Sequence, residues 1–368
     1  MKPEDTSSPR RIKVALVAAE YWPDGGGAER QLRQVLRQVG HDDRFDICVI
    51  TKGKRSLATS ANDGTLRIHR ISRGKSDDYV SSSKFSAGAF WALIREKPDI
   101  LIGSMLQSAT MTAGLYAFLF RRPLIVRLAG GGIDSAGNVV SETKMALATK
   151  KGAIIRSILS RKSTTVVAPA RHLLDDPALS PYTTPDRRIQ IPNGVDLDSR
   201  HEQSAVHGDV IWYGRNDPAK NPAALGRIAA QAHELNFVAI GRIDLEEMTN
   251  LNQLGWVESP EAVIANCKVA LMTSLYEGTP NFALQALALG KWVVGLRNDA
   301  LEELASDFPE CVRLTDDETE VVALLRAAID QTPPPLTTGV PTISDSAATW
   351  VEVIIDRATR SRSTSRHK

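Results

Sequence analysis

The sequence predicts an α/β protein with two parallel sheets covered by helices, and three observations support this. Short apolar runs alternate with helical patterns over most of the chain, which is typical of parallel sheets. The 368 residues suit two domains, since a domain commonly holds roughly 100–200 residues. Between Pro192 and Asp209 the alternation gives way to a polar stretch rich in Asp, Ser and His.

The first half opens with a buried-strand pattern from Ile12 to Ala18. A helix with apolar residues at helical spacing follows and ends near Gly40. Later short apolar runs predict strands, and two longer patterns predict helices. The strands are Phe45 to Ile50, Leu66 to Ile71, Ile100 to Gly103, Leu124 to Leu128, Thr165 to Ala168 and Arg188 to Ile191, and the helices are Ser108 to Phe120 and Glu142 to Leu159.

The second half resumes the alternation at Val210 to Tyr213. Its further predicted strands are Phe237 to Ile240, Val269 to Met272, Trp292 to Val294 and Val312 to Leu314, and its helices are Pro222 to Leu235, Asn281 to Leu289 and Glu318 to Ile329. A Pro-rich segment at Thr332 to Pro335 precedes a last helix from Ser344 to Arg357. We therefore expect two Rossmann-like domains, residues 1–195 and 196–342, and a disordered basic tail over residues 361–368.

Charge and cysteine content exclude several classes of protein. A net charge of +2 argues against a strongly basic nucleic-acid binder. Cys48, Cys267 and Cys311 form no Cys-x-x-Cys pair, which favours a reducing cytoplasm over a disulfide framework. The seven His residues are scattered, so we expect no metal and no other cofactor. No apolar run reaches the roughly 18 residues of a membrane span, and the polar start MKPEDTSSPRR does not resemble a signal peptide.

Two glycine-rich loops follow predicted strands. Gly25-Gly26-Gly27 joins the first strand to the first helix, and Gly130-Gly131-Gly132 follows the strand that ends at Leu128. Backbone amides in such loops, together with a helix N-terminus, approach anions closely, and open α/β sheets bind ligands at this edge. The loops therefore predict a ligand site, although a tight turn without a ligand uses the same glycines.

Two cations follow the strand at Val210 to Tyr213. Arg215 and Lys220 stand in a loop that enters the next helix, so both come close to a helix N-terminus. Free amides and two cations suit a diphosphate, and an Arg binds two oxygens at once. A solvated loop with Asp217 in an ion pair is the alternative interpretation.

The segment from Tyr276 to Gly290 carries two candidate polar side chains. Glu277 stands in the loop before a helix whose first turn holds Pro280, and Gln285 lies more than one turn inside that helix. Both suit one ligand, with the carboxylate for sugar hydroxyls and the amide for a ribose diol. A helix cap and an ordinary polar helix position explain them equally well.

The sequence EGTPNFALQALALG, residues 277–290, resembles the signature Glu-Gly-x-Pro-Asn-x-x-x-Glu-Ala-Met-Ala-x-Gly of the family 4 retaining glycosyltransferases, which have the GT-B fold. From about Ile12 to Ala305, other landmarks of that family follow in order: GGGAER from Gly25, IPNGVD from Ile191, Gly214-Arg215 with Lys220, and Gly255-Trp256-Val257. The resemblance implies two Rossmann-like domains with parallel sheets that face each other across a cleft. It also implies a C-terminal helix, residues 343–360, that packs back on the first domain.

The resemblance assigns roles to individual residues. Arg215 and Lys220 would hold the donor diphosphate and stabilise its charge as the glycosyl bond breaks, and Glu277 would contact the donor sugar. Gln285 stands where the family has a second Glu that binds ribose. The other donor-binding residues would be Gly26, Gly27, Gly278, Thr279 and Asn281. A sugar would pass from a nucleoside diphosphate to a hydroxyl of a glycan, a lipid-linked saccharide or a polysaccharide precursor, with retention and without a metal.

Two departures from the family pattern concern the site itself. Gln285 replaces the second Glu, and no His stands near Ala129, where many members have one. Asp134, just beyond the second glycine loop, is a candidate acceptor contact. The departures leave a second hypothesis open, a catalytically weakened nucleotide-sugar-binding or scaffold protein. A nicotinamide-dependent oxidoreductase, the third hypothesis, explains the first glycine loop alone.

Two more segments have both a functional and an ordinary explanation. Asp196-Leu197-Asp198 spells the Asp-x-Asp of metal–diphosphate sites, and we interpret it as a turn and helix start. Residues Lys144 to Lys162 place six cations among apolar residues, which suits peripheral contact with the inner face of an anionic membrane. A helix with one face packed on the sheet and the other solvated explains the same pattern.

Overall fold

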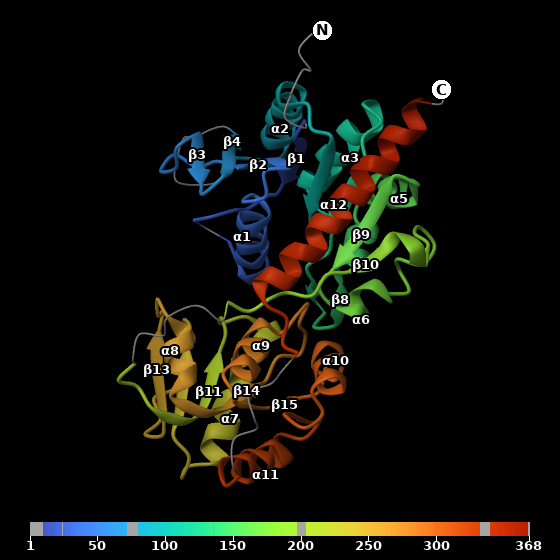
Figure 1. Cartoon of the computed structure of the whole chain (residues 1–368). Coiled ribbons are helices and arrows are strands. Elements are labelled where there is room, and N and C mark those ends of the chain that lie inside the picture. The colour runs from blue at the N-terminus through green and yellow to red at the C-terminus, as the bar shows by residue number, and fades with distance from the viewer. Residues whose placement is uncertain are drawn as a thin grey trace.

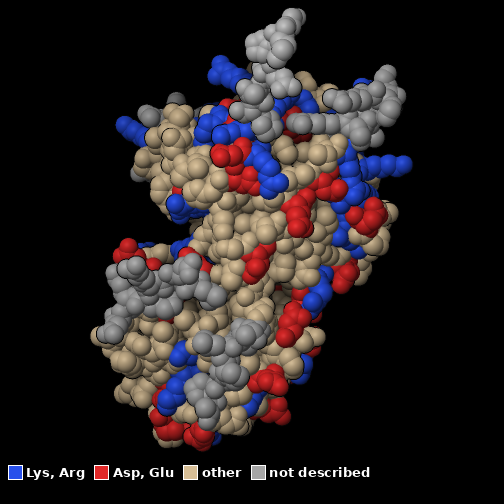
Figure 2. All heavy atoms as spheres, viewed as in Figure 1, with Lys and Arg blue, Asp and Glu red and all other residues tan. Residues whose placement is uncertain are grey.

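The computed structural model describes residues 10–23, 25–71, 80–134, 136–196, 204–331 and 339–366, with side chains as far as residue 360. Figure 1 shows two α/β bodies, one above the other, with the long helix α12 (Ile343–Arg366) lying along the upper one. The notch between the bodies is visible at the left of Figure 2.

The first body is built on an eight-stranded sheet that is parallel except for its edge strand β3. The central strand β1 sets the register, since Val14 pairs with Ile47 on one side and Ile100 on the other. Across the sheet the strands are β10 (Arg188–Gln190), β9 (Thr164–Ala168), β6 (Leu124–Arg127), β5 (Ile100–Ser104), β1 (Ile12–Val17), β2 (Phe45–Lys52), β4 (Leu66–Ile71) and β3 (Ser60–Asp63).

Helices cover both faces of this sheet because its central strands are apolar on both sides. One face buries Phe85, Tyr116 and Ile158 from three helices, and the other buries Leu36 of α1 and Trp350 of α12. The helices of this body are α1 (Gly27–Val39), α2 (Ser82–Glu96), α3 (Ser108–Leu119), α4 (Glu142–Ala148), α5 (Gly152–Ser160) and α6 (Arg171–Leu174), and a hairpin of β7 (Gly131–Ile133) and β8 (Val139–Ser141) precedes α4.

The second body is built on a six-stranded parallel sheet whose strands are β13 (Leu251–Gly255), β12 (Phe237–Ile240), β11 (Gly208–Tyr213), β14 (Cys267–Met272), β15 (Trp292–Leu296) and β16 (Val312–Thr315). Two cores flank it, one under α8 (Pro260–Ala265), α9 (Asn281–Ala288) and α10 (Asp299–Asp307), the other under α7 (Pro222–Gln231) and α11 (Glu318–Ile329). Because all its strands are parallel, the loops that follow their carboxyl ends lie together at one end of the sheet. Sheets of this class bind ligands at that end.

The chain crosses between the bodies twice, and the two crossing segments run side by side. Val195 pairs with Thr342 in a parallel bridge, and the backbone N–H of Val195 donates to the carbonyl of Pro341 at 2.8 Å. After the second crossing, α12 packs on α1 and buries Trp350 and Ile354 in the first body. The last helix thus completes the core of the body in which the chain began.

Most predicted elements are present, but two expectations were wrong. The helix expected from Glu142 to Leu159 is two helices, because Thr149 after α4 has an extended backbone with φ −74° and ψ 161°. Helix α12 reaches Arg366, so residues 361–366 of the tail expected to be disordered are helical, and residues 367 and 368 lie outside the described part. Strand β3, the β7–β8 hairpin, β13 and helices α2, α6, α8 and α10 were not predicted, since most are short.

Candidate functional site

The N-termini of helices α1 and α9 face each other where the two bodies meet. A Cβ built on Gly27 lies 3.4 Å from Nδ2 of Asn281, the first residue of α9. Each helix N-terminus carries free amides and a partial positive charge. One of these amides, the Gly26 N–H just before α1, already donates to Oε2 of Glu29 at 2.9 Å. Their convergence makes this junction favourable for an anion.

The second glycine loop touches the Glu277 segment. Gly278 has room for no side chain, because a Cβ there would overlap the carbonyl oxygen of Ala129 and lie 2.7 Å from Cα of Gly130. Glu142 holds the loop from behind, accepting the N–H of Ala129 at 2.9 Å and of Gly130 at 3.3 Å. Burial raises the pKa of Glu142 although these amides oppose the shift. The two bodies therefore meet backbone to backbone beside Glu277.

Lys220 and Glu277 form an ion pair at the carboxyl edge of the second sheet. Lys220 Nζ lies 2.5 Å from Oε1 of Glu277, and Ser274 Oγ donates to the same oxygen at 2.7 Å. The Glu277 side chain is 8% exposed, whereas the Lys220 side chain is 26% exposed. Oε2 of Glu277 accepts no hydrogen bond from the described residues. The pair thus presents one partly open cation and one carboxylate oxygen that is available to a ligand.

Backbone hydrogen bonds explain why Lys220 and Glu277 meet. Lys220 ends a short 3₁₀ turn, Pro218–Lys220, which Asp217 caps by accepting the N–H of Ala219 at 2.9 Å. The Leu275 N–H donates to the carbonyl of Ala219 at 2.8 Å, so the loops after β11 and β14 are joined. These strands are neighbours in the sheet, and their loops therefore leave the same edge side by side.

The Arg215 side chain does not join this pair. It is 77% exposed and lies 3.6 Å from Asp217. This is the solvated loop with an Asp217 ion pair that stood as the alternative interpretation. Arg215 remains in the same loop as Lys220, three residues before the capped 3₁₀ segment.

A buried asparagine connects α9 to the crossing segment. Asn193 Nδ2 donates to Oδ1 of Asn281 at 2.9 Å, and Asn193 Oδ1 accepts from Nη2 of Arg127 at 3.5 Å. Asn193 and Arg127 are both buried, and burial lowers the pKa of Arg127. Asn193 belongs to the IPNGVD motif from Ile191, but neither it nor Arg127 was assigned a role from the sequence. In the structure they fix the first residue of α9.

Gln285 has a carboxylate partner that the sequence analysis missed. Its Nε2 donates to Oε1 of Glu261 at 3.1 Å, and Glu261 lies in the first turn of α8. Position 285 therefore has no carboxylate of its own, but Glu261 of the neighbouring helix α8 places one beside it. A Pro-Glu pair after Gly255-Trp256-Val257 was the available signal, because Pro and Glu both favour the first turn of a helix.

The remaining predicted residues have local roles. Thr279 Oγ1 donates to the carbonyl of Gly278 at 2.9 Å, inside the loop before α9. Asp134 accepts the N–H groups of Ala136 and Asn138, each at 2.9 Å, and these bonds close the β7–β8 turn and lower its pKa. Leu197 and Asp198 of the Asp-x-Asp motif lie outside the described residues. Within the described ranges, no group of three or more His, Cys, Asp or Glu side chains is placed to hold a metal ion.

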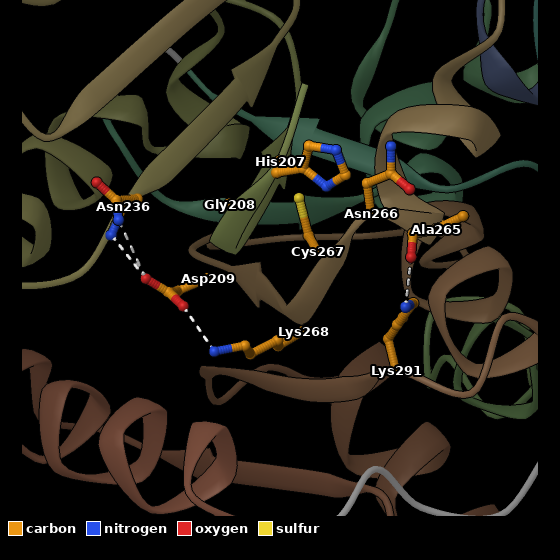
Figure 3. Close-up of a pocket in the computed structure, with 9 residues that line it drawn as sticks. All are labelled: His207, Gly208, Asp209, Asn236, Ala265, Asn266, Cys267, Lys268 and Lys291. Atoms are coloured by element: carbon orange, nitrogen blue, oxygen red, sulfur yellow. Dashed lines mark hydrogen bonds and ion pairs between the residues drawn. The ribbon is translucent and has the colours of Figure 1, made fainter. Parts of the chain in front are cut away.

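A separate pocket of about 460 Å³ lies at the amino ends of the strands of the second sheet, and Figure 3 shows its lining. Asp209 and Lys268 form an ion pair there at 2.9 Å, and Lys291 Nζ donates to the carbonyl of Ala265 at 2.6 Å. These residues precede or begin their strands, whereas Glu277 follows the carboxyl end of β14. The pocket and the candidate site are thus at opposite ends of the same strands.

Comparison with known proteins shows which family the second body resembles and which solved structures share the fold. Residues 209–330 match the family model described as Glycosyl transferases group 1. No curated protein sequence matches the chain. Sucrose-phosphate synthase from Thermosynechococcus elongatus has a TM-score of 0.66 at 14% identity, with 97% of this chain and 99% of that chain covered.

Two further solved structures share the fold. WaaG, a glycosyltransferase involved in lipopolysaccharide biosynthesis, has a TM-score of 0.63 at 13% identity, covering 94% of this chain and 95% of that one. The UDP-GlcNAc 2-epimerase from Neisseria meningitidis, bound to UDP-GlcNAc, has a TM-score of 0.59 at 12% identity, covering 94% and 100%. The chain therefore has the GT-B fold, and the resemblance to glycosyltransferases predicted from its sequence is confirmed.

Proposed function

We propose that this protein is a retaining glycosyltransferase that moves a hexose from a nucleoside diphosphate to a hydroxyl acceptor. The observation that carries the proposal is the 2.5 Å contact between Lys220 and Glu277 beside the converging N-termini of α1 and α9. A cation and two helix N-termini suit a diphosphate. The available Oε2 of Glu277 suits the hydroxyls of the donor sugar.

In this proposal Lys220 and the backbone amides beside it stabilise the negative charge that develops on the diphosphate as the glycosyl bond breaks. Lys220 would donate to the leaving diphosphate, and the amides of Gly278 and Thr279, in the loop just before α9, would donate further hydrogen bonds to it. The Arg215 side chain is exposed, so it can turn toward the phosphates when a donor binds. Because these groups already supply positive charge, the proposed reaction needs no metal.

The acceptor is proposed to be a glycan, a lipid-linked saccharide or a polysaccharide precursor. WaaG, which shares the fold, supports a saccharide acceptor by its role in lipopolysaccharide biosynthesis. We propose that the reaction takes place in the cytoplasm, since Cys48, Cys267 and Cys311 are free and buried. No helix among the described residues is long and apolar enough to cross a bilayer.

A second candidate is a nucleotide-sugar-binding protein with weak or no transfer. Two observations favour it. The Gln285 amide is engaged by Glu261, and no His stands near Ala129. A fold shared with a UDP-GlcNAc 2-epimerase also shows that the architecture alone does not select the reaction.

One experiment with the purified chain separates these candidates. Thermal shifts are measured with UDP, GDP, NAD and a panel of nucleotide sugars, because a ligand of the native state raises Tm. Donors that bind are then incubated with saccharide acceptors, and products are separated by liquid chromatography, which resolves isomers, and read by mass spectrometry. Transfer predicts a free nucleoside diphosphate and a heavier acceptor. Binding without release supports the second candidate, an isomerised donor of unchanged mass indicates epimerisation, and a shift with NAD alone contradicts the proposal.

A further inference from the structure

Helix α3 exposes a stripe of large apolar side chains. Leu115, Phe118 and Leu119 are 52%, 63% and 55% exposed, and their spacing of three and four residues places them on one face of the helix. Phe120, at the end of the helix, is 47% exposed. Burying such side chains is normally favourable, so a cluster left in water marks an interaction surface.

Neighbouring helices extend this stripe. Trp91 of α2 is 66% exposed and Ile154 of α5 is 51% exposed. Six of the eleven exposed large hydrophobic residues in the described part of the chain thus come from three adjoining helices, and we call them the apolar patch: Trp91, Leu115, Phe118, Leu119, Phe120 and Ile154. The concentration on α2, α3 and α5 argues against random scatter.

Defined contacts hold the helices of the patch together. Helix α2 meets α3 through an edge-to-face pair of Phe90 and Tyr116, 6.1 Å apart. Arg161, just after α5, lies 5.2 Å from the ring centre of Phe118, and its Nη2 donates to the carbonyl of Ala117 at 3.2 Å. The apolar side chains therefore stand on a rigid base, with a cation among them.

Positive charge predominates around α3, α4 and α5. Residues 108–163 include nine Lys or Arg but only two acidic residues, of which Glu142 is buried and Asp134 closes a turn. On the face drawn in Figure 2, by contrast, both signs are interspersed. Six of the cations around the patch are exposed: Arg121, Lys144, Lys150, Lys151, Arg156 and Lys162.

We propose that this face docks on an anionic lipid bilayer, with the apolar patch at the level of the headgroups and the cations against lipid phosphates. Aromatic and aliphatic side chains beside Lys and Arg are the composition that binds such surfaces. A second copy of the chain is disfavoured as the occupant, because a two-fold contact would bring the same cations together. Docking requires no nucleotide sugar, so the proposal goes beyond the proposed function.

The face also reaches the candidate site. Met145 of α4 is 37% exposed, and its Cε lies 3.9 Å from a Cβ built on Gly132, in the loop that touches Gly278. A bilayer bound along α3, α4 and α5 would therefore extend to the rim of the junction between the two bodies. This placement suits an acceptor carried by a lipid.

The test is vesicle sedimentation of the full chain without any donor. Wild type is mixed with vesicles of phosphatidylglycerol and phosphatidylcholine, and with vesicles of phosphatidylcholine alone. Two variants probe the face, L115S/F118S/L119S for the apolar patch and K150E/K151E for its charge. The control R227E/R326E makes the same change in charge on α7 and α11 of the second body; both arginines are exposed but pair with Glu318 and Glu234, so the Tm of this control is compared with that of wild type.

The proposal predicts that wild type and the control sediment with the anionic vesicles and remain in solution with phosphatidylcholine alone. Each patch variant is expected to lose about tenfold or more in bound fraction, while its Tm and its thermal shift with nucleotide sugars stay unchanged. The proposal is overturned if wild type ignores anionic vesicles, or if both patch variants bind as wild type does. A wild-type dimer that the serine variant disperses, without vesicle binding, assigns the face to a second copy instead.

Discussion

Lys220 Nζ and Glu277 Oε1, 2.5 Å apart, join loops from two neighbouring strands of the second sheet. Glu277 is buried among Ser274 and Lys220, so its charge orients a lysine whose tip is still partly open. A lysine held in place before a ligand arrives loses less side-chain entropy on binding. We therefore treat the pair as one unit in which Glu277 positions Lys220 and also offers an oxygen to the donor.

Replacing Lys220 with Met is expected to weaken UDP binding about tenfold or more. The substitution removes the cation but keeps most of the side-chain volume, and a charge-assisted hydrogen bond to phosphate contributes about 1.5–3 kcal/mol. Isothermal titration with UDP measures the loss. Lys268→Met is the matched control, since Lys268 also pairs with a carboxylate, Asp209, at the opposite end of the sheet. If K220M and K268M bind UDP with equal affinity, Lys220 is not part of the donor site.

Gly278→Ala is expected to abolish donor binding without unfolding either body. The added methyl overlaps the carbonyl of Ala129 and comes within 2.7 Å of Cα of Gly130, and both are backbone atoms that cannot turn aside. The two bodies must then move apart at the candidate site. Gly132→Ala is the control on the other side of this contact, in the Gly130–Gly132 segment, because its Cβ meets nothing closer than 3.9 Å. Tm and thermal shift with UDP are measured for both variants, and UDP binding by G278A at the wild-type level contradicts this reading of the contact.

The contact between Gln285 and Glu261 predicts opposite effects for two substitutions. Gln285→Glu places a second carboxylate about 3.1 Å from Oε1 of Glu261, so the variant is expected to lose stability at pH 7 and to recover part of it at pH 4, where one carboxylate binds a proton. Adding Glu261→Gln restores one amide and one carboxylate. The double-mutant cycle in denaturant should give a favourable coupling of about 1 kcal/mol or more. Additive effects would show that the two side chains do not interact.

Glu303 predicts a pH dependence of stability. It accepts the N–H groups of Arg171 and His172 and the Nδ1 of His172, and so joins α10 of the second body to α6 of the first. Burial alone would raise its pKa, but the hydrogen bonds from His172 and the backbone outweigh burial and lower the pKa below the usual 4.5. Because the folded pKa is lower than the unfolded one, this stabilisation is complete above about pH 4.5 and is lost as pH falls through the folded pKa.

Glu303→Gln tests this interface. The variant should be less stable than wild type by about 1–3 kcal/mol at pH 7, with the difference shrinking as the pH falls below 4. Denaturant unfolding at pH 7, 5 and 3.5 measures the difference. Glu302→Gln is the adjacent control, because Glu302 is 49% exposed and, among the described residues, forms a surface ion pair with Arg297. A difference between E303Q and wild type that does not depend on pH would contradict the lowered pKa.

Much of the fold could be predicted because its strands are short, apolar and separated by turn residues. The six strands predicted for the first body after β1, and the five of the second, follow patterns that burial on both faces imposes. The break between α4 and α5 could not be predicted, since apolar spacing continues across Thr149 and only the backbone there departs from a helix. The helical end of α12 was missed because its Arg and Ser composition is also that of disordered tails.

The candidate site was predicted unevenly for a physical reason. Lys220 and Glu277 lie after neighbouring parallel strands, so sheet topology alone brings their loops together. Glu261 was missed because its contact with Gln285 depends on how α8 packs beside α9, which side-chain volumes decide and spacing does not reveal. Asp134 looked like a candidate from its place in the chain, but the hairpin turn that its carboxylate closes was not visible in the pattern.

We propose that Lys220 and Glu277 act together on the nucleoside diphosphate sugar as its glycosyl bond breaks. The decisive test is mass spectrometry of the nucleoside diphosphate released when a donor panel is incubated with saccharide acceptors, with wild type and Glu277→Gln at equal concentration. We expect wild type to release the diphosphate from at least one donor and E277Q, with its fold intact, to do so about a hundredfold more slowly or worse. Equal release by the two proteins, or no release by wild type from any donor that it binds, would contradict it.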